Sequence, residues 1–210
     1  MTPWILFGAG QGCGLALAQR AAGERPLYAL VRRATQAQRL RDLGVQVTLG
    51  DARDSALLAA LFQQAGTESA ILSTLGGGGC DYSAHRAVID QGVAHGISRM
   101  LLVTSLGCGD SWPLLSPAAR AAFGQVVREK SLAESWLQSS GMTYCILRPG
   151  GLLPGEATGQ AQLYAAPRHG LVRRADVALW MHRLMGQPQA WGQIHTLIDP
   201  QLQADAARAT

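Results

Sequence analysis

A glycine-rich turn near the start of the chain has the residue types and spacing that bind phosphate. Residues Trp4–Phe7 are consecutively apolar, as in a buried strand, and glycines occupy every second position of the turn that follows. Where such a turn leads into a helix, bare backbone N–H groups meet anionic oxygens, and the missing Cβ atoms let a ligand approach the main chain. The sequence therefore predicts a dinucleotide pyrophosphate site at Gly8, Gly10, Gln11, Gly12, Cys13 and Gly14.

The spacing of this turn departs from the usual dinucleotide-binding motif. A GxGxxG pattern that begins at Gly8 meets Cys13 where the third glycine belongs, and a GxxGxxG pattern meets Gln11 in its middle. The alternative interpretation is a glycine-rich turn without a ligand. The position of the turn directly after the first strand favours phosphate binding.

Two arginines, Arg32 and Arg33, follow the second apolar run, Leu27–Val31. An NAD-selective site has an acidic residue at about this distance from the turn, where it binds the ribose diol. A guanidinium there favours NADP(H) over NAD(H), because a charge-assisted hydrogen bond to the 2′-phosphate is worth about 1.5–3 kcal/mol, roughly ten- to a hundredfold in affinity. The alternative is that the arginines are solvated at the start of a surface helix.

Apolar runs alternate with helical patterns from the first strand to about residue 148. Several runs are apolar at consecutive positions, which is typical of strands in a parallel sheet that helices cover on both faces. We therefore predict an α/β fold with a doubly wound, mostly parallel sheet. The predicted strands are Trp4–Phe7, Leu27–Val31, Val45–Leu49, Ala70–Leu72, Met100–Thr104 and Tyr144–Leu147.

The second half of the chain contains two further helices and a loop-rich segment. Ser116 before Pro117 predicts the start of a long helix that runs to about Ser139 and turns Lys130 toward the sheet. After a segment rich in proline and glycine, a last helix is expected over 175–185 and a last strand over 194–198. We predict one domain over 1–210, in which 149–200 forms the lip of the substrate side.

Composition limits the class of protein. The chain has 210 residues, 48% of them hydrophobic and 15% charged, which fits one compact domain. Eighteen Lys and Arg against 14 Asp and Glu give a net charge of only +4, without the basic run of a nucleic-acid binder. No stretch reaches the roughly 18 apolar residues of a membrane span. We expect a cytoplasmic monomer or homodimer that binds a small molecule, without nucleic-acid or membrane partners and without a metal. Its cysteines, in no metal-ligand spacing, are Cys13, Cys80, Cys108 and Cys145.

Seven short motifs occur in the order and spacing of the atypical short-chain dehydrogenase/reductases. Over about residues 3–198 the chain resembles this family, in particular the NmrA-like NAD(P)-binding proteins and the biliverdin/flavin reductases. The resemblance implies a Rossmann fold and NAD(P) binding. The motifs are Gly8-Ala9-Gly10, Val31-Arg32, Gly50-Asp51-Ala52, Ser73-Thr74-Leu75-Gly76, Val103-Thr104-Ser105-Leu106-Gly107, Lys130 with Glu134, and Arg148-Pro149-Gly150-Gly151.

The resemblance implies further cofactor contacts. Asp51 would accept a hydrogen bond from the adenine amino group while Ala52 packs beside the base, although Asp51 equally suits a loop cap. The four glycines 76–79 fit either a flexible loop or a passage for cofactor or substrate. The remaining implied positions, which include those beside the cofactor ribose, are Ser73, Thr74, Leu75, Gly76, Thr104, Pro149, Gly150 and Gly151.

Two residues match catalytic positions of the family. Ser105 matches the catalytic serine, and its hydroxyl would hold a substrate carbonyl or the nicotinamide amide. A serine at a strand end also commonly bonds only nearby backbone. Lys130 matches the lysine of the YxxxK pair, which binds the nicotinamide ribose, and the alternative is a surface partner of Glu134.

The tyrosine of the YxxxK pair is missing, because Val126 stands four residues before Lys130. Loss of a positioned general acid costs roughly 10² to 10⁴ in rate, so ordinary alcohol–ketone chemistry is not expected. A conjugated hydride acceptor such as a quinone or flavin fits, because its reduced form is a stabilised anion that takes its proton from water. No other acid has a motif behind it, and His85 is expected on a helix surface.

Two functions remain open at this point. One is an NADPH-dependent reductase of the atypical short-chain type, acting on a flat conjugated acceptor. The other is a regulatory or assembly protein that binds NADP(H) without turnover, as the resemblance to NmrA-like proteins and Val126 allow.

Overall fold

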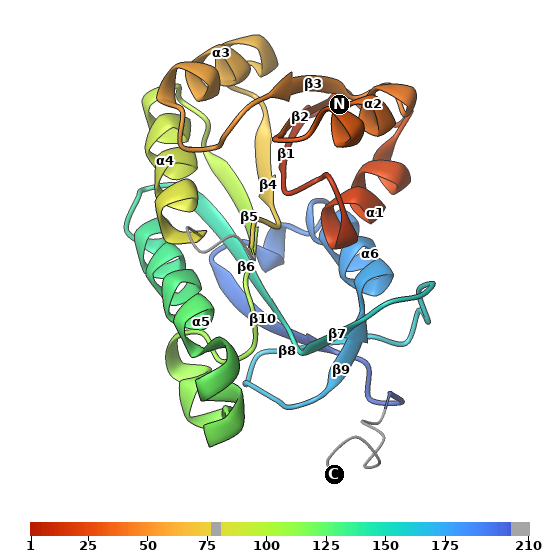
Figure 1. The fold of residues 1–210 in the computed structure, drawn as a ribbon, viewed down its shortest axis with the longest axis vertical. Helices are drawn as coiled ribbons and strands as arrows, with labels where there is room; N and C mark the ends of the chain where they lie inside the picture. The colour runs from red at the N-terminus through yellow and green to blue at the C-terminus, as the bar shows by residue number, and fades with distance from the viewer. Residues whose placement is uncertain (77–80, 203–210) are drawn as a thin grey trace.

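The computed structural model of the chain describes residues 1–76 and 81–202. Its main sheet has the strand order β3-β2-β1-β4-β5-β6-β10-β8, and each described pair is parallel except β8 with β10 (Figure 1). The predicted α/β fold with a doubly wound, mostly parallel sheet is confirmed. In sequence order these strands are β1 (Trp4–Phe7), β2 (Leu27–Val31), β3 (Gln46–Leu49), β4 (Ala70–Ser73), β5 (Arg99–Val103), β6 (Thr143–Pro149), β8 (Gln162–Tyr164) and β10 (Gln193–Ile198).

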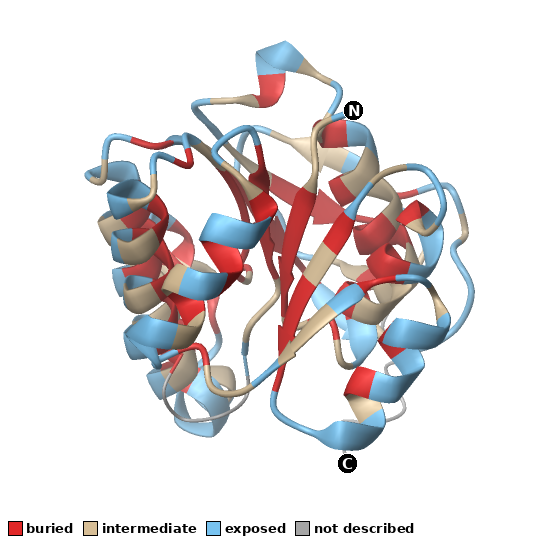
Figure 2. Ribbon diagram, turned by 90° about the horizontal axis from the view of Figure 1, so that it is seen from above, coloured by how far each residue is buried: buried red, intermediate tan, exposed pale blue. Residues whose placement is uncertain are grey.

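Helices cover both faces of this sheet, and the side chains of β1 explain why its run is apolar throughout. Trp4 and Leu6 point into one core layer, whereas Ile5 and Phe7 point into the other, so each strand position is buried. Figure 2 shows this buried band running along the strands. The first layer includes α1 (Gly12–Ala21), α2 (Ala34–Asp42) and α6 (Arg174–Leu184), and the second includes α3 (Ser55–Ala65), α4 (Asp81–Ala94) and α5 (Pro117–Gln138).

The helix starts follow from their capping residues. Asp54 accepts hydrogen bonds from the backbone N–H groups of Ala56 and Leu57 and so starts α3. Ser116 accepts from the N–H of Ala119, with a proline at the first helical position of α5. The predicted bounds of α5, α6 and β10 are each confirmed to within one residue.

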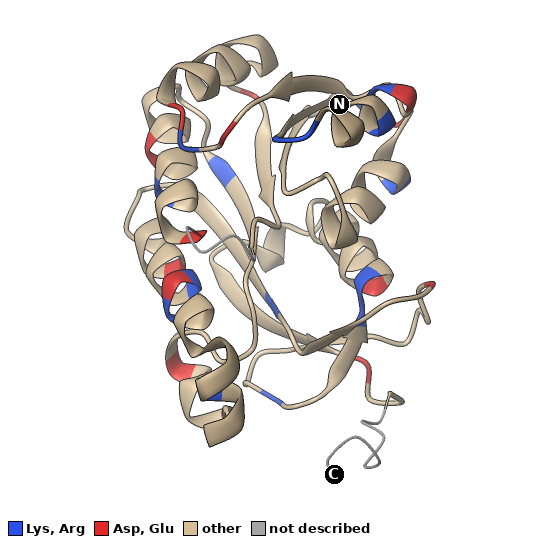
Figure 3. Cartoon of the chain, viewed as in Figure 1, with Lys and Arg blue, Asp and Glu red and all other residues tan. Residues whose placement is uncertain are grey.

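Shorter elements complete the described chain. Two 3₁₀ helices are η1 (Gly109–Leu114) and η2 (Pro188–Ala190), and a small parallel pair is formed by β7 (Gly151–Leu153) and β9 (Leu171–Arg173). On the surface helices, basic and acidic residues are interspersed (Figure 3). Over 1–76 and 81–202, no helix is long and apolar enough to span a membrane.

A buried ion pair ties α5 to the sheet. Arg148 on β6 donates from Nε and Nη2 to the two carboxylate oxygens of Glu134, at 3.0 and 2.7 Å, and also binds Asp110. The side chains of Arg148 and Glu134 are only 4% and 2% exposed. Burial disfavours the charged guanidinium, yet the hydrogen bonds from Arg148 to Glu134 and Asp110 raise its pKa above the usual value. Glu134 is therefore not the surface partner of Lys130 that helical spacing allows.

We predict that Glu134→Gln lowers the free energy of unfolding by about 3–5 kcal/mol, because it leaves the Arg148 charge buried without its main partner. Urea denaturation measures this loss. The matched control is Arg86→Gln, which breaks the exposed Arg86–Asp90 pair of α4 and should cost less than about 1 kcal/mol. Equal losses in the two variants would contradict the role given to the buried pair.

Candidate functional site

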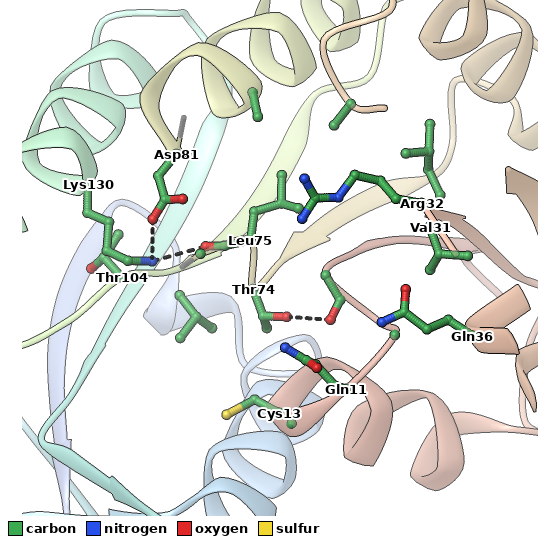
Figure 4. Close-up of a pocket in the computed structure, with 18 of the residues that line it drawn as sticks. Gln11, Cys13, Val31, Arg32, Gln36, Thr74, Leu75, Asp81, Thr104 and Lys130 are labelled. Atoms are coloured by element: carbon green, nitrogen blue, oxygen red, sulfur yellow. Dashed lines mark hydrogen bonds and ion pairs between the residues drawn. The ribbon is translucent and has the colours of Figure 1, made fainter. Parts of the chain in front are cut away.

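The carboxyl ends of β1, β2, β4 and β5 open into one cavity of about 490 Å³. The cavity lies where the strand order reverses between β1 and β4, which is the usual ligand site of open α/β sheets. Its volume is typical of sites for small molecules and cofactors. Figure 4 shows side chains from several elements pointing into this space.

The glycine-rich turn lines the cavity, and a Cβ at several of its glycines would meet a neighbouring atom at close range. Gly8 has a φ of 81°, and a Cβ on Gly10 would lie 2.4 Å from the Gln36 side chain. A Cβ on Gly14 would lie 2.4 Å from the carbonyl oxygen of Gly8. Because the backbone itself faces the cavity and α1 begins at Gly12, the turn fits a pyrophosphate. Gly14 does not line the cavity, and its role is close packing of α1 on the turn.

The end of β2 brings one of the two predicted arginines into the cavity. Both arginines are exposed, but only Arg32 lines the cavity, whereas Arg33 stands at the start of α2 and does not. Gln36, one turn into α2, enters beside Arg32 (Figure 4). Helical spacing from Arg32 was the only sequence signal that could have identified Gln36.

Asp51 and Ala52 also line the cavity, after β3. The Asp51 carboxylate accepts hydrogen bonds from the backbone N–H, Nε and Nη2 of Arg53, each at 2.9 Å. The Arg53 side chain, through these hydrogen bonds, lowers the pKa of Asp51 to about 2. Asp51 thus makes the loop-capping contact that was the alternative interpretation, and it also faces the cavity.

The loop after β4 is supported from behind by a buried histidine. Thr74, Leu75 and Gly76 line the cavity, but Ser73 does not, because its hydroxyl is buried and lies 3.0 Å from His85 Nε2. His85 Nδ1 lies 2.8 Å from the backbone carbonyl oxygen of Asp81, which can only accept a hydrogen bond, so Nδ1 is the ring nitrogen that carries the hydrogen. In the neutral ring Nε2 is then an acceptor, and the Ser73 hydroxyl donates to it.

Burial is the main cause that lowers the pKa of His85 to about 4, and the ring is therefore neutral. The expectation of a surface position for His85 was wrong, because the residue faces the core side of α4.

Lys130 reaches the cavity from α5. Its Nζ donates to the carbonyl oxygen of Leu75 at 3.0 Å and lies 3.8 Å from the Asp81 carboxylate. Asp81 is buried and lines the cavity (Figure 4). No sequence motif pointed to Asp81, and Lys130 faces the sheet side as predicted.

Thr104 and Ser105 line the cavity after β5. The Thr104 hydroxyl donates to Glu134 at 2.6 Å, and the Ser105 hydroxyl donates to the carbonyl oxygen of Leu106 at 2.9 Å. The backbone contact that a strand-end serine often makes is thus present. Val126 is not among the residues that line the cavity.

Three predicted residues at the end of β6 and just after it do not face the cavity. Pro149, Gly150 and Gly151 do not line the cavity. Gly150 N–H donates to Leu197 at 3.0 Å, and Gly151 N–H donates to Gly170 at 2.9 Å. The substrate-side role of 149–200 remains a prediction, and glycines 77–79 with Cys80 lie outside the described residues.

Cys13 lines the cavity as predicted, and burial raises the pKa of its thiol to about 11. It therefore stays protonated and offers no nucleophile.

In the described part of the chain, no group of three or more His, Cys, Asp or Glu could hold a metal ion. Val31 and Val103 also line the cavity, although the motifs that contain them assigned them no contact. Sequence reasoning missed other lining residues that lie in no motif: Leu30, Ala84, Leu152 and Arg174.

Comparison with known proteins agrees with this geometry. A family model of NAD(P)H-binding proteins matches residues 8–188. The structure of ChuY, an anaerobilin reductase from Escherichia coli O157:H7, is 55% identical, covers 97% of this chain and 100% of that one, and has a TM-score of 0.93. ChuY from E. coli CFT073 is 51% identical with the same coverage and a TM-score of 0.87.

A more distant curated relative is the uncharacterized sugar epimerase YhfK of Bacillus subtilis (strain 168). It is 26% identical over 166 residues, which cover 74% of this chain and 73% of the relative. The family match spans most of the chain. It starts directly after β1 and includes β2, β4 and β5, whose carboxyl ends open into the cavity. The chain therefore belongs to the NAD(P)H-binding family of Rossmann-fold proteins, among the atypical short-chain dehydrogenase/reductases.

Proposed function

We propose that the protein is an NADPH-dependent reductase of a conjugated tetrapyrrole of the anaerobilin class. The observation that carries the proposal is the 55% identity to an anaerobilin reductase over the whole of that chain. Anaerobilin is a conjugated tetrapyrrole, which belongs to the flat, conjugated acceptors that the missing tyrosine favours. Quinones and flavins, which are also conjugated, come second to the tetrapyrrole as acceptors in this proposal.

The described residues fit NADPH, which supplies a hydride when it is bound. The backbone of Gly8, Gly10 and Gly12 would hold the pyrophosphate, and Arg32 with Gln36 would hold the 2′-phosphate. Asp51 would hold the adenine end, with Ala52 beside it. Ser105 and Lys130 would orient the nicotinamide end.

Lys130 acts in this proposal as a fixed cation rather than as a proton donor. Leu75 and Asp81 hold its ammonium group at the cavity wall, so it would bind the ribose hydroxyls and set the orientation of the ring. Without a positioned acid, the acceptor has to delocalise the charge that it gains and take its proton from water. A long conjugated system does this, whereas an isolated carbonyl does not.

We predict that Arg32→Gln weakens NADPH binding about ten- to a hundredfold and leaves NADH binding nearly unchanged, because only NADPH carries the 2′-phosphate. Titration calorimetry measures both constants. Arg33→Gln is the matched control, since Arg33 is its neighbour and does not line the cavity. If Arg33→Gln were the variant that lost NADPH preference, the assignment of the two arginines would be reversed.

We also predict that the protein oxidises NADPH with anaerobilin at least about 10² times faster than with simple aldehydes, because aldehydes need the general acid that is missing. The measurement is the loss of NADPH absorbance under anaerobic conditions, with a quinone and a flavin in the same panel. Aldehyde turnover at the tetrapyrrole rate would refute the interpretation of Val126. Tight NADPH binding without turnover of any acceptor would favour the regulatory alternative.

A further inference from the structure

We propose that Arg174, the first residue of α6, binds the cofactor pyrophosphate beside the glycine-rich turn, where α1 begins. Arg174 lines the same cavity. A Cβ built on Gly12 would lie 3.5 Å from Arg174 Cδ and 3.9 Å from its Nε, so the arginine side chain passes directly over the start of α1. The inference rests on the cofactor placement proposed above.

The guanidinium of Arg174 is available for a ligand. Within the described residues it makes no hydrogen bond or ion pair, although the side chain is half-buried. The neighbouring arginines are engaged, since Arg173 donates to the carbonyl oxygen of Pro154 and Arg148 pairs with Glu134. A half-buried cation that faces a cavity without an acceptor favours an anionic ligand there.

The backbone of Arg174 is held in place relative to the turn. Helix α6 packs against α1 in one core layer, through Val177, Ala178 and Met181 on α6 and Leu17 and Ala18 on α1 (Figure 1). Because the two helices are packed together, their N-terminal ends stay near each other. The backbone that carries the Arg174 side chain is therefore held close to the turn before a ligand binds, which reduces part of the entropy lost on binding.

A buried carboxylate fixes the start of α6 from the other side. Asp176 accepts hydrogen bonds from the N–H groups of Thr158 and Gly159, each at 2.9 Å. These bonds join the lip segment to the first turn of α6, so a ligand that binds Arg174 is coupled to the lip as well.

Position selects the pyrophosphate among the anionic groups of the cofactor. Arg32 and Gln36 lie in the part of the cavity that we assign to the 2′-phosphate. Lys130 lies beside Asp81, in the part that we assign to the nicotinamide, and Figure 4 shows these side chains. Arg174 lies beside Gly12, where the backbone N–H groups of α1 begin. Its charge also reaches the turn, where it opposes the burial that raises the pKa of Cys13 to about 11. A planar guanidinium suits two phosphate oxygens in a bidentate contact.

The test is titration calorimetry on Arg174→Gln with NADPH, NADH and ADP-ribose. All three contain the pyrophosphate, so each should bind about ten- to a hundredfold more weakly, with the NADPH-to-NADH ratio retained. Adenosine 2′-monophosphate, which lacks the pyrophosphate, should bind as it does to the unaltered protein. Arg174→Lys, which keeps the charge but loses the fork, should show an intermediate loss.

Arg183→Gln is the matched control, because Arg183 is exposed near the other end of α6 and lies over the Trp180 ring. It should leave all constants unchanged, and thermal unfolding of each variant checks that the fold is intact. Unchanged NADPH affinity in Arg174→Gln would overturn the proposal, and a rise only in the KM of the acceptor would assign Arg174 to a substrate carboxylate instead. If Arg32→Gln and Arg174→Gln both bind NADPH normally, the cofactor placement itself fails.

Discussion

The close approach of α1 to the turn after β1 is the constraint on which the site depends. At Gly14 a Cβ would lie 2.4 Å from the carbonyl oxygen of Gly8 and 2.6 Å from the Thr74 hydroxyl, so α1 approaches the turn after β1 and the end of β4 too closely for a side chain on Gly14. Thr74 adds a bond by donating from its hydroxyl to the carbonyl oxygens of Phe7 and Gly8, each at 3.3 Å. The backbone that faces the cavity is therefore fixed before any ligand arrives.

Behind the cavity wall, two buried hydrogen-bond networks hold residues that face the cavity. Ser73 and His85 support the loop at Leu75, whose carbonyl oxygen in turn accepts from Lys130. Glu134 and Arg148 form the second network, which receives the Thr104 hydroxyl. In both networks the buried donors and acceptors are paired, which is the condition for a polar group in a core to stabilise rather than weaken it. Lys130 and Thr104 thus gain fixed positions from residues that do not line the cavity.

The sequence was sufficient for the sheet, because the consecutive apolar residues of a strand such as Trp4–Phe7 have one main physical explanation. The sequence predicted an arginine at the end of β2 but could not decide whether Arg32 or Arg33 lines the cavity. That choice depends on the direction in which each side chain points, which neighbouring residues at a strand end do not reveal. Helical spacing paired Lys130 with Glu134, yet tertiary contacts gave Glu134 to Arg148 and Lys130 to Leu75. Local patterns do not predict such partners, because the fold brings Glu134 to Arg148, and Lys130 to Leu75, from different elements of the chain.

Charge inside the cavity explains how a chain with a net charge of only +4 can suit a strongly anionic cofactor. The two carboxylates that line the cavity are compensated locally, Asp51 by Arg53 and Asp81 by Lys130. Arg32 after β2 and Arg174 at the start of α6 line it without an ion pair among the described residues. A low-dielectric cleft strengthens the field of such cations over a few ångströms, whereas the interspersed surface charges are screened by salt (Figure 3). The distribution of charge, more than its sum, therefore favours one bound dinucleotide over a long polyanion.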